Sequence, residues 1–162
     1  MKRISSRGAA ALVAALSLAA VISCGSDNST GTGPTGSISG TITFRNPWPA
    51  TGSIFVTVFS TYPPSGAPDG FTNPITENQL SATRTYDFKL SGLQTGTYAA
   101  VLIGWRGGVG NDKCMGLYWA YVDSLGIDPD CNAQAPGPTA VTVKKNQTTE
   151  HVNMVCDLSL AP

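Results

Sequence analysis

Charged side chains are scarce in this chain of 162 residues, since Asp, Glu, Lys and Arg make up only 12% of it. Soluble domains usually carry about 25%. After residue 24 the only basic cluster is the pair Lys144–Lys145, so nucleic acid is not an expected partner. The sequence after residue 24 shows no helical periodicity. The whole chain contains 18 Gly and 11 Pro, a composition that favours short strands joined by turns.

Catalytic and metal-binding motifs are equally scarce. The single histidine, His151, falls on the polar face of a predicted strand, and a lone His builds neither a catalytic triad nor a zinc site. Four aspartates could offer oxygen ligands to calcium, but their spacing fits no EF-hand loop and suits turns instead. They are Asp112, Asp123, Asp128 and Asp130. We therefore expect no enzyme, no cofactor and no metal site.

The first 23 residues have the anatomy of a signal peptide. Lys2, Arg3 and Arg7 form a positive region, and residues 8–22 are uncharged and rich in Ala, Leu and Val. This apolar run is shorter than the roughly 20 residues that a membrane-spanning helix needs. Removal of the segment leaves seven basic residues against ten acidic ones, which gives the mature chain a formal net charge of −3.

Residues 21–24 read VISC and follow the apolar run directly. This tetrapeptide resembles the bacterial lipobox, in which an aliphatic and a small residue lead into an invariant cysteine. The resemblance implies that Cys24 receives a diacylglyceryl group and that the signal is cut before it. Two or more acyl chains make a stable anchor. We expect the protein in the cell envelope, anchored by lipid to a bacterial membrane (the outer membrane is favoured), with its domain in the periplasm or at the cell surface.

A polar stretch separates the anchor from the rest of the chain. Residues 25–36 read GSDNSTGTGPTG and contain no apolar residue larger than proline. Such a segment buries too little surface to offset the entropy of ordering, so it is predicted to be a flexible linker that spans roughly 20 Å. The expected organisation is a signal peptide over 1–23, a lipidated cysteine and linker over 24–36, and one domain over 37–162.

The domain shows alternating apolar and polar residues in segments separated by turns. Strands are predicted near 38–44, 53–60, 85–90, 97–105, 115–122, 140–144 and 149–158, with residues 145–147 at the tip of a closing hairpin. Patterning of period two at this spacing predicts an all-β fold, a single antiparallel β-sandwich of about seven strands with prealbumin-like or immunoglobulin-like topology.

Two motifs resemble the carboxypeptidase-regulatory-like domains, which are prealbumin-like sandwiches. They are GSISGTI at 36–42 and YDFKLSGLQTGTY at 86–98. In the second motif a strand ends, a turn follows at 94–96, and Thr97 opens the next strand, so Gly92 and Gly96 are expected to have positive φ. The resemblance covers 36–105 and, more weakly, 139–158. It implies a non-catalytic accessory, adhesive or binding module.

Three cysteines remain once Cys24 carries lipid. Cys156 alternates with Val152 and Met154, which predicts a buried side chain that behaves as a small hydrophobe. Cys114 and Cys131 lie in turn-like stretches on either side of one predicted strand, and we expect a disulfide between them. In the chain-entropy model, closing that loop stabilises the fold by about 3 kcal/mol.

Two strands carry apolar residues on both faces. Phe55 and Phe59 point away from the inward set of their strand, and Trp105 is predicted to lie on the outer face with Val101 and Ile103. In one interpretation residues 107–138 cover this face. In the other it is an aromatic platform for a sugar or peptide. Its candidate ligand-binding residues are Trp105, Trp119 and Tyr118.

The predicted function follows from the anchor and the module. We expect a membrane-anchored, non-catalytic envelope lipoprotein that serves as a protein-interaction or structural accessory module for an unidentified envelope protein. The alternative is a carbohydrate-binding lipoprotein that uses exposed aromatic side chains to hold a glycan.

Overall fold

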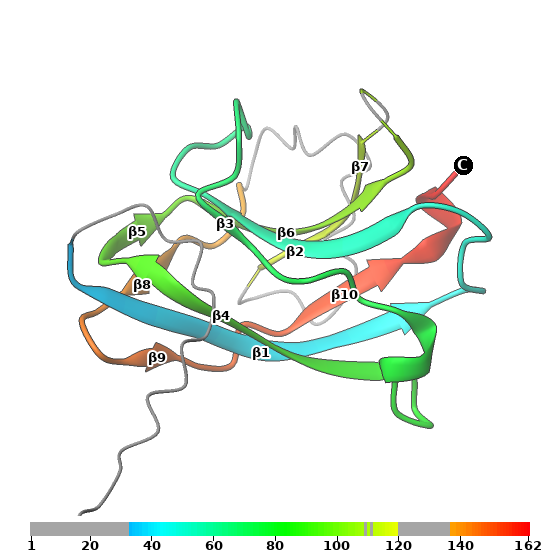
Figure 1. Ribbon diagram of the computed structural model, residues 1–162, viewed down its shortest axis with the longest axis horizontal. Coiled ribbons are helices and arrows are strands. Elements are labelled where there is room, and N and C mark those ends of the chain that lie inside the picture. The colour runs from blue at the N-terminus through cyan, green and yellow to red at the C-terminus, as the bar shows by residue number, and fades with distance from the viewer. Residues whose placement is uncertain (1–32, 109, 111, 120–136) are drawn as a thin grey trace, which may run out of the picture.

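A computed structural model describes residues 33–108, 110, 112–119 and 137–162. In this part of the chain the regular elements are ten β-strands and two 3-10 helices, and no α-helix is present (Figure 1). The predicted all-β fold is confirmed. The strands are more numerous than the seven expected because several are pieces of two to four residues.

The first sheet is built around β1 (Thr35–Arg45). Strand β4 (Thr85–Gln94) pairs with it antiparallel, whereas β9 (Thr148–Thr149) and β10 (Met154–Asp157) pair with it parallel. The parallel pairs correct the expectation of a wholly antiparallel fold. They arise because the strand before β9 belongs to another sheet, so the chain returns to β1 by a crossover rather than by a hairpin.

The second sheet is antiparallel and has the order β3-β2-β6-β7, and a smaller sheet pairs β5 with β8. The strands of the second sheet are β2 (Ser53–Phe59), β3 (Gly70–Phe71), β6 (Ala100–Arg106) and β7 (Asp112–Leu117). The smaller sheet contains β5 (Gly96–Tyr98) and β8 (Val141–Val143), and the 3-10 helices are η1 (Glu77–Gln79) and η2 (Leu158–Leu160).

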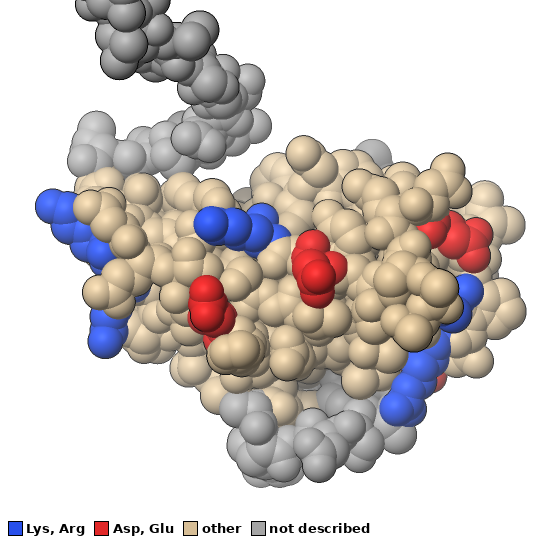
Figure 2. Space-filling model, turned by 90° about the horizontal axis from the view of Figure 1, so that it is seen from below, with Lys and Arg blue, Asp and Glu red and all other residues tan. Residues whose placement is uncertain are grey.

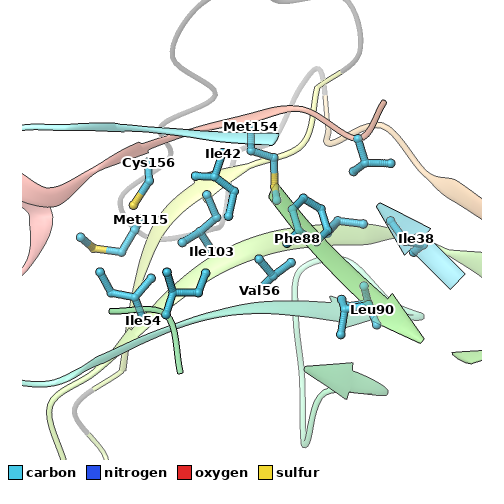
Figure 3. Packing of buried hydrophobic residues seen from close by; sticks show 14 of the residues in the cluster. Ile38, Ile42, Ile54, Val56, Phe88, Leu90, Ile103, Met115, Met154 and Cys156 are labelled. Atoms are coloured by element: carbon cyan, nitrogen blue, oxygen red, sulfur yellow. The ribbon is translucent and has the colours of Figure 1, made fainter. Parts of the chain in front are cut away.

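The hydrophobic core lies between the two larger sheets. Figure 3 shows Ile42, Phe88 and Met154 from the first sheet gathered with Val56 and Ile103 from the second. The inward sets predicted for β1, β2 and the C-terminal segment are confirmed, since these side chains are at most 4% exposed. They are Ile38, Ile42, Phe44, Ile54, Val56, Val58, Val152, Met154, Cys156 and Leu158.

The strand predicted over 97–105 is two strands in different sheets. The chain bends at Ala99, so that β5 pairs with β8 and β6 pairs with β2. The bend shifts the alternation by one residue, and a shift of one exchanges the two faces of a strand. Val101, Ile103 and Trp105 therefore face the core, opposite the prediction, and Leu102 lies on the outer face.

The segment predicted as a strand over 149–158 is also broken, into β9 and β10. A turn does form before it, with Asn146 at φ 54° and the Gln147 N–H donating to the Lys144 carbonyl over 3.2 Å. The predicted closing hairpin is nevertheless wrong, because β8 pairs with β5 while β9 pairs with β1. His151 is exposed, as predicted.

The turn between β4 and β5 matches the motif analysis. Gly92 has φ 74° and Gly96 has φ 157°, which confirms the expected positive values. Gly92, however, lies within β4 at a register shift against β1 rather than in the turn itself. The Tyr98 hydroxyl donates to the Gln94 carbonyl over 2.9 Å, an arrangement like the tyrosine corner of other sandwiches. Burial, with a smaller contribution from Asp69, raises the pKa of Tyr98, so the hydroxyl stays a donor.

Strand β1 runs the length of the sandwich and defines its two ends (Figure 1). Its 11 residues extend over about 35 Å. We call the end where β1 begins at Thr35 the near end, and the end where β1 stops at Arg45 the far end. The turns at 94–96 and 144–147 lie at the near end, and the chain terminus after η2 lies at the far end.

Candidate functional site

Trp105 is a core residue rather than a surface platform. Its side chain is 2% exposed, and its indole Nε1–H donates to the Thr51 carbonyl over 2.9 Å. The ring lies directly against Gly52 and Gly107, where an added Cβ would overlap it. Because the side chain is buried and its polar atom is paired within the protein, Trp105 offers no exposed face on which a ligand could stack.

Tyr118 and Trp119 are half-buried and lie on opposite sides of the second sheet. The backbone N–H of Tyr118 donates to the Val101 carbonyl over 2.9 Å, and its side chain packs against the main core. Trp119 packs instead on an outer cluster of Leu102, Cys114 and Leu117. The three predicted ligand-binding aromatics are therefore not brought together.

The second sheet does have an apolar outer face, but some of its residues differ from those predicted. Phe55 and Phe59 lie on it as expected, and the β6 side chain that packs on it is that of Leu102, which is 6% exposed, rather than that of Trp105. Phe59 packs at the edge of the outer cluster together with Tyr62 and Trp119. One part of this face is thus covered by Tyr62, which follows β2, and by Trp119, which belongs to the 107–138 segment of the covering interpretation. Most of that segment lies outside the described residues, so the interpretation stays a prediction.

The remainder of this face forms an open groove of about 600 Å³, which we call the outer groove. Phe71 is 59% exposed at its mouth, and no other large hydrophobic side chain of the described residues is exposed. Gly104 forms part of the floor, where an added Cβ would meet nothing closer than 3.8 Å. The lining is mostly apolar, and its polar members are Thr57, Arg106, Asp112 and Lys113. The remaining lining residues are Phe55, Phe59, Pro64, Gly66, Ala67, Pro68, Phe71, Leu102, Gly104, Trp105 and Cys114.

An ion pair borders the outer groove at the β6–β7 end. The Arg106 guanidinium donates from Nε to one Asp112 oxygen over 2.9 Å and from a terminal nitrogen to the other over 3.2 Å. The hydrogen bonds and the charge of Asp112 raise the pKa of Arg106. The pair itself is neutral, but exposed Lys113 lines the same edge, so the groove favours a largely apolar partner surface with a polar or acidic group near this edge.

A second hollow, of about 770 Å³, lies at the far end around Trp48. Trp48 is half-buried and packs on Phe44 with ring centroids 5.4 Å apart and planes inclined by 52°. Arg84 donates to the Asn46 carbonyl over 2.6 Å, and the Asn46 amide donates to Asp157 over 2.6 Å. Sequence reasoning missed this hollow because its lining comes from two segments far apart in the chain, 44–48 and 77–84.

Phe71 was also missed from the sequence. Its two-residue strand is too short to show alternation, and only its register opposite Thr57 fixes it beside the groove. The neighbouring Thr72 is buried, and its hydroxyl accepts from the Val56 N–H over 3.0 Å. Asp69 accepts from the Ser60 N–H and closes the loop that precedes the strand.

Of the two cysteines in the described part of the chain, Cys156 is a free thiol and Cys114 is in a disulfide. Cys156 is a free thiol with 0% exposure, as its inward position predicted. Burial first and the nearby Asp157 second raise the pKa of this thiol, so it remains protonated and unreactive. Cys114 is disulfide-bonded. Its predicted partner Cys131 lies outside the described residues, as do Cys24 and the aspartates at 123, 128 and 130, so the Cys114–Cys131 pairing stays a prediction.

Neither metal ligation nor membrane crossing is indicated in the part of the chain that the structure describes. Its His, Cys, Asp and Glu side chains form no group of three that could hold an ion. Its helices are too short and too polar to traverse a bilayer. Comparisons of the chain with known protein families, with curated proteins and with solved structures found no match.

Proposed function

We propose that the chain is a lipid-anchored, non-catalytic module of the bacterial cell envelope that binds a protein partner through the outer groove. The anchor is the lipid predicted on Cys24. The domain then lies in the periplasm or at the cell surface, with the outer membrane as the favoured support. An oxidising compartment also suits the predicted Cys114–Cys131 disulfide.

The observation that carries this proposal is the exposed aromatic surface of the outer groove. Phe71 is 59% exposed beside Phe55 and Phe59, in a domain whose other large apolar side chains are buried or half-buried within the described residues. An apolar patch bordered by polar residues is typical of a protein-interaction site, and aromatic side chains supply a large share of such interfaces.

A photo-crosslinking residue placed at Phe71 in intact cells tests the proposal. A discrete crosslinked adduct is expected from position 71, and none from Lys89, an exposed residue on β4. A second variant, Gly104→Val, fills the groove floor where a Cβ has room, and it should reduce the adduct about tenfold while leaving the domain folded. An anchored, folded protein without an adduct at position 71 would contradict the proposal.

Carbohydrate binding at the far end is the second candidate, because Trp48 lies among polar side chains suited to hydroxyl groups. Arg45, Asn46, Glu77 and Arg84 line the hollow with it. Aromatic faces stack on apolar faces of sugar rings, and a preformed polar rim fixes their orientation. Titration with soluble envelope glycans should quench Trp fluorescence in the native chain, and Trp48→Ala should abolish the response, whereas Gly104→Val should preserve it.

A further inference from the structure

The near end of the sandwich is a fixed platform beside the start of β1. The Asn146 N–H donates to the Thr35 carbonyl over 2.8 Å, and the Ser37 N–H donates to the Gln147 carbonyl over 2.9 Å. On the other side, the Thr95 N–H donates to the Pro34 carbonyl over 3.0 Å. The β8–β9 turn is therefore held against the point where the chain enters the domain, 11 residues after Cys24.

This platform carries uncompensated positive charge. Lys144 and Lys145 are both exposed on the β8–β9 turn. Neither takes part in an ion pair with another described residue, since the ion pairs there join Arg84 to Glu77 and Arg106 to Asp112. Figure 2 shows blue side chains and no red ones at the extreme left of the molecule, which is the near end in Figure 1.

The far end is different, because its charges balance. Arg84 pairs with Glu77 at 3.6 Å. Hydrogen bonds from Ser159 and Asn46 together with the charge of Arg45 lower the pKa of Asp157, which keeps that carboxylate ionised beside Arg45. Two cations and two anions thus offset each other there, while the turn at the near end carries two cations.

We propose that the near end docks on an anionic lipid surface through Lys144 and Lys145. The proposal depends on the lipid anchor at Cys24 described under the proposed function. Because Pro34 and Thr35 are already held in the domain, the predicted linker is reduced to residues 25–33 and spans roughly 16 Å. The anchor therefore confines the turn near the headgroups, and on contact its ammonium groups come within the roughly 10 Å over which charges act at 0.1 M salt.

The charge distribution makes the docked orientation specific. Apart from Lys144 and Lys145 the described residues carry five basic and six acidic side chains, so the rest of the described surface has no net attraction to anionic lipid. The two lysines of the β8–β9 turn are attracted to it, and each contributes most when its ammonium reaches the headgroup phosphates. The domain then stands with the near end on the membrane and the Trp48 hollow pointing away from it.

Lysine labelling of the intact lipidated chain in vesicles tests this docking. The chain is reconstituted into phosphatidylcholine vesicles with or without phosphatidylglycerol, treated with an amine-acetylating reagent, and mapped by peptide mass spectrometry. Acetylation of Lys144 and Lys145 should slow about fivefold in the anionic vesicles and recover in 0.5 M salt. Lys89 and Lys113, which are exposed away from the turn, are internal controls and should react equally in both.

Two variants separate docking from nonspecific protection. Lys144→Glu should remove the protection of Lys145, whereas Lys113→Glu should leave it unchanged. Equal acetylation of the turn in both kinds of vesicle, with the chain floating with the vesicles, would overturn the docking and leave the anchor intact. Failure of the chain to float with neutral vesicles would instead overturn the anchor itself, and the docking with it.

Discussion

Trp105 shows how a single side chain is fixed by its surroundings. Its indole fills space between the two sheets, its Nε1–H has a backbone acceptor in Thr51, and Gly52 and Gly107 leave room for its ring. The sequence identified Trp105 as the end of the most apolar segment but placed it on the wrong face, because the bend at Ala99 leaves no mark in the alternation.

Substitution of Trp105 measures this burial. Trp105→Ala removes a side chain that is 2% exposed and leaves a cavity, so the free energy of unfolding should fall by about 3–5 kcal/mol. Urea denaturation followed by circular dichroism measures the change. Phe71→Ala is the matched aromatic control and should change stability by about 0.5 kcal/mol or less, since its side chain is exposed. A stable Trp105→Ala variant would refute the core placement.

At the scale of elements, alternation predicted the inward faces well and the connections poorly. Ile38 and Ile42 on β1, or Val56 and Val58 on β2, are buried on the face that period two assigns them. The breaks that divide 97–105 and 149–158 depend on which sheet each piece joins. Sheet membership is set by contacts between distant segments, so a local pattern cannot reveal it.

The candidate sites likewise contain some residues that a local sequence pattern identifies and others that only contacts between distant segments bring together. Phe55 and Phe59 were recognised because they break the alternation of a long strand. The groove that they border also needs Gly104 as a floor and Phe71 from β3, and these come together only when β2 pairs with β3 and β6. The motif around Tyr98 was predictable because its turn is local, with the hydrogen bond closing over four residues.

Cys114 lies on β7, and its predicted disulfide with Cys131 can be tested by peptide mapping. Peptide mapping of the mature protein without reduction should find one bridge, Cys114–Cys131, and one free thiol at Cys156. That thiol should resist alkylation at pH 8 in the native protein and react after unfolding, because burial raises its pKa. Because the pKa of Cys156 is higher in the folded than in the unfolded chain, the free energy of unfolding does not depend on this thiol below the ordinary thiol pKa. It falls as pH rises above that value. A bridge that includes Cys156 would contradict this assignment.

At the scale of the whole molecule the two ends of the sandwich differ in charge and in the surfaces that they carry. The near end holds the start of β1 and the lysine turn, and the far end holds the Trp48 hollow. The outer groove lies along the side between them, on the face of the β3-β2-β6-β7 sheet. A short lipid tether at the near end would leave both candidate binding surfaces accessible to a partner in the envelope.

Lipid attachment at Cys24 underlies both the proposed function and the membrane docking, and metabolic labelling with a fatty-acid analogue detects it. The native chain should incorporate the label and fractionate with membranes. Cys24→Ser should lose the label, because the acyl acceptor is gone, and the protein should be released or keep its signal peptide. Equal labelling of the native chain and the Cys24→Ser variant would rule out lipid attachment at Cys24, whatever the outer groove binds.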